Sequence, residues 1–173
     1  MTGKITIDRL DVLLAHAQVL ETEAMERYQD LAEQMEVHHN HDVAKLFRKM
    51  AHVESIHVQK IIERAGDITL PQIHPWDYQW PDEEAPEVIS DDDIHYLMTP
   101  HHALMLALKA EQRALDFFTH VVENLSDGPV RDMAEQLRVE ETEHVALIKD
   151  WLARVDEPGE DWDEDPDPPV LQE

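Results

Sequence analysis

The sequence predicts an all-α protein, an antiparallel four-helix bundle with a long crossover between its second and third helices. The chain has only four glycines in 173 residues, and alanine, leucine, glutamate and glutamine, which favour helices, are abundant. Four long segments carry apolar residues spaced alternately three and four apart, the spacing of a helix with one buried side. We expect one domain over residues 1–155 and an acidic, proline-rich tail over 156–173, extended or disordered.

The first two helices are expected at about 6–36 and 42–65. A histidine-rich stretch, 38–41, breaks the apolar pattern between them and predicts a short turn joining antiparallel neighbours. Gly66 is placed to end the second helix. Polar residues interrupt the apolar side of these helices at three positions: Glu21, Glu54 and His57.

Residues 66–98 form a connection with four prolines. Its length is enough to run along the bundle and join two parallel helices at opposite ends. We expect its aromatic residues, Trp76, Tyr78 and Trp80, to lie against the helices. The run Ser90–Asp93 predicts the start of a short helix that ends near Met98.

The third helix is predicted to begin with Thr99 as N-cap and Pro100 at its first position. The fourth follows the turn at residues 126–129 and runs to about Val155. In the third helix Glu111 occupies an apolar position. In the fourth, Glu141 and His144 do so, three residues apart on one face, whereas Glu140 and Glu143 fall off that face.

The same spacing occurs twice along the chain. Glu21-x6-Tyr28 is followed by Glu54-x2-His57, and Glu111-x6-Phe118 is followed by Glu141-x2-His144. The two hairpins are therefore expected to meet as pseudo-symmetric halves. One inward glutamate from each of two helices and Glu-x-x-His from each of the others is the known ligand set of ferritin-like di-iron bundles, a template that these positions match.

A pair of metal ions also suits the charges. Four carboxylates carry −4, which two divalent ions neutralise, and a mixed oxygen and nitrogen set suits iron or manganese, with zinc able to compete. The alternative is a set of buried Glu–His pairs that satisfy only one another. Six such groups converging at one level would be poorly satisfied without an ion.

With these motifs the chain resembles the ferritin-like superfamily, and within it the rubrerythrin-type proteins, over about residues 6–155. The resemblance implies a di-iron centre, with Glu54 and Glu141 as bridging carboxylates and Tyr28 close to the site. It also implies an oxidoreductase that reduces H2O2 or O2, and we expect a homodimer. The alternative is an iron-binding or iron-storage protein without turnover. The implied metal ligands are Glu21, Glu54, His57, Glu111, Glu141 and His144.

The chain departs from relatives of this kind at several positions. Typical rubrerythrins carry a further carboxylate at the place of Ala114, and Ala24 is the equivalent position in the first helix. Ser55 stands where bacterioferritins have their haem-binding methionine, so no haem is expected. With no cysteine there is no rubredoxin domain, and electrons must come from an external donor protein.

Composition excludes several other classes. The absence of cysteine rules out disulfides, cysteine-ligated iron–sulfur clusters and a thiol nucleophile. The net charge of −25 argues against nucleic-acid binding, and the crossover and tail hold 18 of the 39 acidic residues. No apolar run has the length to span a membrane and no signal peptide is evident, so we expect a cytoplasmic protein that does not bind membranes.

Overall fold

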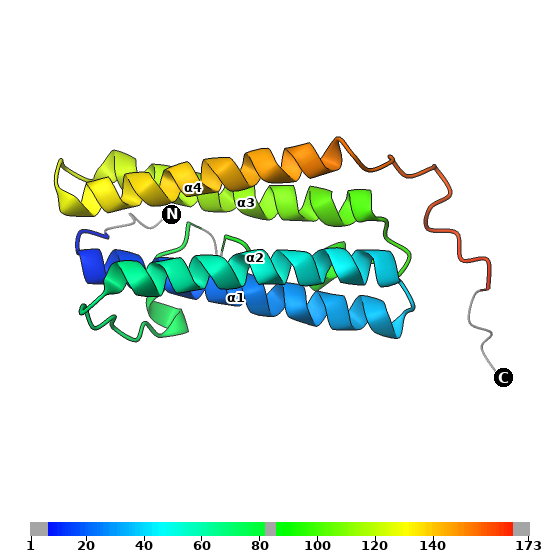
Figure 1. Cartoon of the computed structure of the whole chain (residues 1–173), viewed down its shortest axis with the longest axis horizontal. Coiled ribbons are helices and arrows are strands. Elements are labelled where there is room, and N and C mark those ends of the chain that lie inside the picture. The colour runs from blue at the N-terminus through cyan, green and yellow to red at the C-terminus, as the bar shows by residue number, and fades with distance from the viewer. Residues whose placement is uncertain (1–6, 82–85, 168–173) are drawn as a thin grey trace.

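The computed structural model describes residues 7–81 and 86–167. Within these ranges it contains no strand and four long helices: α1 (Leu10–Val37), α2 (His41–Ala65), α3 (Pro100–Asn124) and α4 (Pro129–Leu152). Helices α1 and α4 run in one direction and α2 and α3 in the other (Figure 1). Helix α1 packs mainly against α2, and α3 against α4, so two antiparallel hairpins face each other. The predicted all-α four-helix bundle is confirmed.

The helix ends follow local chemistry. Thr99 accepts a hydrogen bond from the backbone of His102, whose ring in turn accepts one from the Thr99 backbone, and Pro100 opens α3. Gly66 ends α2 at φ 52°, in the region that glycine adopts without strain. Two helices are shorter than predicted. Helix α1 starts at Leu10, because Arg9 is still extended, and α4 ends at Leu152.

The crossover runs along the bundle from the end of α2 to the start of α3 (Figure 1). Its described residues contain only two short 3-10 turns, η1 (Pro75–Asp77) and η2 (Asp91–Asp93). The predicted helix ending near Met98 is wrong, since the chain is extended again at Ile94. The Ser90 hydroxyl accepts from the Asp92 backbone and caps η2, as the sequence predicted, but the turn ends at Asp93.

The crossover aromatics divide between core and surface. The Trp80 ring lies edge-on to Phe117 of α3 at 5.2 Å and to His16 of α1 at 5.3 Å, as the sequence predicted. Trp76 is 78% exposed and stacks only on His74, so the expectation was wrong for this residue. Trp76 lies in η1, and no residue of that turn is buried.

The core consists of two apolar clusters, and every helix passes from one to the other. Helix α1 changes cluster between Leu20 and Ala24, α2 between Ala51 and Ile61, and α3 between Ala110 and Ala114. Helix α4 makes the same change between Leu137 and Ile148. A polar layer therefore lies across the middle of the bundle, where the acidic positions of all four helices fall.

The tail is described as far as residue 167 and contacts both the crossover and the start of α3. The Trp162 ring lies 4.0 Å from that of His102 and edge-on to His95, and the Tyr96 hydroxyl donates to Asp165 at 2.7 Å. No α-helix occurs between residues 153 and 167. The remainder of the tail lies outside the described residues.

Candidate metal centre

All six predicted ligands lie in the polar layer between the two apolar clusters. The four glutamates are 1–3% exposed, His57 is 9% exposed, and His144 is largely buried. They form two groups, one from each hairpin, in which one possible ligand atom of each residue lies within 4.8 Å of the others. The groups are Glu21, Glu54 and His57, and Glu111, Glu141 and His144.

Each histidine turns its Nδ1 atom toward the two carboxylates of its own group. In the first, His57 Nδ1 lies 3.0 Å from Glu54 and 3.5 Å from Glu21. In the second, His144 Nδ1 lies 3.2 Å from Glu141 and 3.3 Å from Glu111. One nitrogen and two carboxylates thus converge on one point in each half, and a cation there would replace the ring proton.

The two halves meet through their histidines. The rings of His57 and His144 stack with centroids 4.0 Å apart and planes inclined by 10°. The repeated sequence spacing thus becomes a pseudo-twofold arrangement in space, with both nitrogen donors side by side.

Without a metal, this layer is held by protons. Burial raises the pKa of Glu21 to about 8, and repulsion from Glu141 adds to the shift. Burial also raises the pKa of Glu54 and of Glu141. For His144, burial opposes the charged form, but the contacts with Glu111 and Glu141 outweigh it and raise its pKa to about 11. The carboxylates are costly to ionise together, so the layer is built to receive positive charge.

Tyr28 and Phe118 mark the asymmetry between the halves. Tyr28 is 1% exposed, stacks on Phe47, and its hydroxyl has no hydrogen-bond partner. Burial, followed by repulsion from the nearby Glu111, holds the pKa of Tyr28 well above the usual value. Phe118, at the matching repeat position, is equally buried but carries no polar atom.

The off-face glutamates behave as the spacing predicted. Glu143 is exposed. Glu140 forms a two-bond ion pair with Arg64 of α2, with 2.9 Å between Nη1 and Oε2. This ion pair joins the two hairpins beside the metal layer. Because Glu140 binds Arg64, its carboxylate does not contribute to the metal layer.

One buried acid was not predicted. Glu87, in the crossover, is 2% exposed, and its carboxylate lies within 4.8 Å of those of Glu21 and Glu141. It belongs to no helix, so periodicity could not identify it. The only sequence signal is that two apolar residues, Val88 and Ile89, follow it, unlike the other crossover acids.

A small cavity adjoins the second half of the site. Its volume is about 10 Å³, room for roughly one water molecule. The cavity is lined by Met50, Val53, Glu54, Glu111, His144, Leu147, Ile148 and Trp151.

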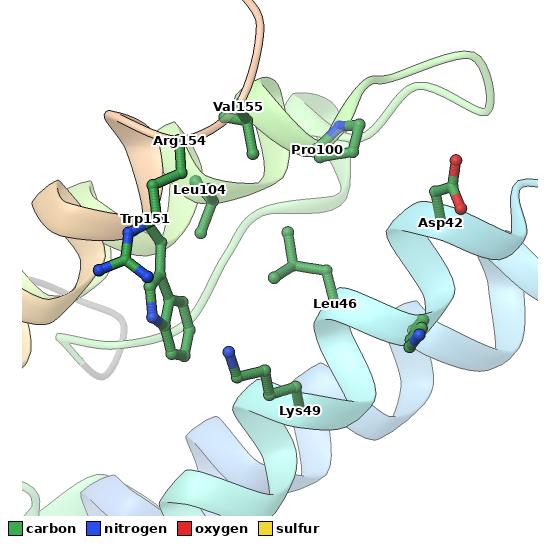
Figure 2. Close-up of a pocket in the computed structure, with 9 residues that line it drawn as sticks. Asp42, Leu46, Lys49, Pro100, Leu104, Trp151, Arg154 and Val155 are labelled. Atoms are coloured by element: carbon green, nitrogen blue, oxygen red, sulfur yellow. The ribbon is translucent and has the colours of Figure 1, made fainter.

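Trp151 also lines a larger surface groove of about 540 Å³ between α2, the start of α3 and the end of α4 (Figure 2). We call this the Trp151 groove. The Lys49 ammonium lies 3.7 Å from the centre of the Trp151 ring. Because Trp151 lines both the groove and the site cavity, its indole forms part of the wall between them. The groove is lined by Asp42, Lys45, Leu46, Lys49, Pro100, Leu104, Trp151, Arg154 and Val155.

The residues present fit a pair of metal ions. One oxygen each of Glu21 and Glu111 is buried without a well-formed hydrogen bond, and the histidine Nδ1 of its own group lies 3.5 Å and 3.3 Å away, respectively. Oxygen and imidazole donors in two three-residue groups suit iron, manganese or zinc. Buried acids this close are poorly satisfied by one another, and bound cations would supply the missing partners.

The fold and this donor set define a ferritin-like carboxylate and histidine metal-site protein. The family model described as rubrerythrin matches residues 13–152, and the chain belongs to that family. A solved structure, an uncharacterised conserved protein from Magnetospirillum magnetotacticum MS-1, is similar to it. The two share 37% identity over 87% of this chain and 98% of that one, with a TM-score of 0.65. No match was found among curated proteins. No helix in the described part of the chain could cross a membrane.

Proposed function

We propose that the protein is a di-iron oxidoreductase that reduces H2O2 or O2. The observation that carries the proposal is the convergence of two carboxylate–carboxylate–imidazole groups, related by the repeat, in one buried layer. Iron bound there supplies electrons and Lewis acidity. Reduction of H2O2 to two waters takes two electrons and two protons, so each turnover also needs an electron-donor protein.

The side chains would have distinct tasks. Glu21 and Glu111 each approach a single histidine and would bind one ion each. Glu141 lies close both to its own group and to Glu21, which supports a bridging role, and Glu54 is assigned the matching role by the repeat.

Tyr28 would serve as a hydrogen-bond or electron donor. Its hydroxyl is buried and has no other hydrogen-bond partner. Phe118 cannot donate, so the oxidant should interact differently with the two halves of the site.

The apolar clusters and the small cavity would restrict what reaches the metal. A space this small favours oxidants such as O2 or H2O2 over larger organic substrates. Two apolar clusters border the layer and keep bulk water out, which strengthens every charge interaction within it.

The test is metal loading followed by oxidation. Metal-free protein is titrated anaerobically with Fe(II), and we expect about two irons per chain, then faster oxidation by one of the two oxidants and catalytic consumption with a reductant. The Glu54→Ala/His57→Ala variant should lose bound iron, whereas Glu143→Ala, an exposed change on α4, should retain it. Unchanged iron content in the double variant would refute the site. Iron far above two per chain, without turnover, would indicate storage instead.

A further inference from the structure

Glu87 is an ionisable side chain inside the protein that the six-ligand site does not use. It is 2% exposed, and neither carboxylate oxygen has a hydrogen-bond partner. A buried carboxylate without a donor or a cation is strongly unfavourable, and such groups are normally paired. Its position therefore needs a cause in the structure and a compensating partner.

The cause is a pair of arginines that fix the backbone around it. Arg113 of α3 donates to the carbonyl oxygens on both sides of Glu87, those of Pro86 at 2.6 Å and Val88 at 2.7 Å. Arg27 of α1 donates to the carbonyl oxygen of Ile89 at 2.8 Å and to the Asp91 carboxylate at 2.6 Å.

These contacts direct the Glu87 side chain inward. Both guanidinium groups are engaged by backbone carbonyls and, for Arg27, by Asp91, and neither makes a hydrogen bond to the Glu87 carboxylate. Arg113 and Arg27 hold the segment in place while leaving the acid free.

The compensating partner is indicated by what surrounds the carboxylate. One oxygen of Glu87 lies within 4.8 Å of oxygens of Glu21 and Glu141. Glu21 comes from the first half of the site and Glu141 from the second, so Glu87 approaches the layer where the halves join. Three buried acids at this spacing repel one another when ionised, and no described side chain donates a hydrogen bond to the Glu87 carboxylate.

We propose that Glu87 is a seventh protein ligand of the metal site, supplied by the crossover rather than by a helix. This inference rests on the proposed function, because it requires metal in the layer. Five carboxylates carry −5 against +4 for two divalent ions. The additional negative charge favours the more highly charged, oxidised metal pair, and binding would give the unpartnered carboxylate its missing cation.

The test compares Glu87→Gln, which keeps the shape, and Glu87→Leu, which removes the polar atoms, with the wild type. Glu143→Gln, the loss of an exposed acid on α4, is the matched control. Anaerobic Fe(II) titration measures affinity and stoichiometry, and thermal unfolding is recorded with and without Fe(II). We expect both Glu87 variants to bind at least one iron on the order of tenfold more weakly, in line with losses around metal sites. Their Fe(II)-induced rise in Tm should be smaller, and the control unchanged.

The Tm of the metal-free variants shows whether Glu87 is a metal ligand or a residue that only stabilises the fold. Removing an unpartnered buried polar group should leave the metal-free Tm equal or higher, whereas loss of a stabilising side chain lowers it. A lower metal-free Tm in both variants would overturn the proposal, as would wild-type affinity for two irons in both. If the wild type itself bound no iron, the proposed function would fail, and this inference with it. Full binding in the wild type with indifferent variants would refute the role of Glu87 alone.

Discussion

A glutamate at a leucine position gives up the apolar contacts of a helix interface and adds a charge that needs a partner. The four helices do this at one level only, and the residues one turn away on either side are apolar. Stability is thereby lost locally in exchange for a binding site, as is common at functional positions. Single substitutions in the layer should therefore separate stability from metal binding.

Tyr28→Phe is the simplest such change. The hydroxyl is buried without a hydrogen bond, so its removal should raise the metal-free free energy of unfolding by about 1 kcal/mol. Iron stoichiometry should stay the same, while the reaction with oxidant slows, because the donor is lost. Denaturant unfolding and rapid mixing of Fe(II)-loaded protein with H2O2 measure the two effects. An unchanged oxidation rate would remove Tyr28 from the mechanism.

Among elements, the helices were predictable and the crossover was not. Glu54 and His57 could be placed because the helical repeat shows which positions face the core, so a polar residue at such a position is a candidate ligand. Glu87 points inward only because Arg27 and Arg113, from distant helices, bind the carbonyls beside it. The exposed Trp76 and the partly buried Trp80 likewise differ through tertiary contacts, which local sequence does not encode.

The Arg64–Glu140 pair connects the two hairpins and should contribute to their docking. Both side chains are about three-quarters buried and the pair has two hydrogen bonds, so it should exceed an ordinary surface ion pair. We expect Arg64→Met to reduce the free energy of unfolding by about 1 kcal/mol, with strong coupling to Glu140→Gln in a double-mutant cycle. The Arg154–Asp150 pair is exposed at the C-terminal end of α4 and serves as the control with a smaller effect. Additive effects at Arg64 and Glu140 would show that the pair contributes nothing.

Trp151 of α4 should control access between its groove and the site cavity. Trp151→Ala removes the wall that the two spaces share, so a chelator should extract iron several-fold faster from the loaded variant (Figure 2). Trp76→Ala, at an exposed crossover position, should leave the rate unchanged. Extraction at the wild-type rate in both variants would exclude the groove as a route.

For the whole molecule, the acidic layer couples folding to pH. The folded-state pKa of Glu21 is raised to about 8 and that of His144 to about 11, so between pH 5 and 8 the metal-free folded chain binds more protons than the unfolded one. Stability from these groups is complete at the acidic end of this range and falls as pH rises through their folded pKa values. Glu36 and Glu140, whose pKa values are lowered, act only below this range. His16 and His102, whose pKa values burial lowers, oppose the trend within it but are outnumbered by the layer groups whose pKa values are raised.

We therefore expect the free energy of unfolding of the metal-free protein to decrease from pH 5 to pH 8. Metal ions replace these protons, so the Fe(II)-induced increase in stability, measured anaerobically, should grow over the same range. Glu21→Gln should flatten the metal-free slope, because the glutamine does not titrate, whereas Glu143→Gln should not. A metal-free stability that rises from pH 5 to 8 would mean that the layer is ionised and compensated in another way. A stabilisation by Fe(II) independent of pH would mean that the metal binds outside the layer.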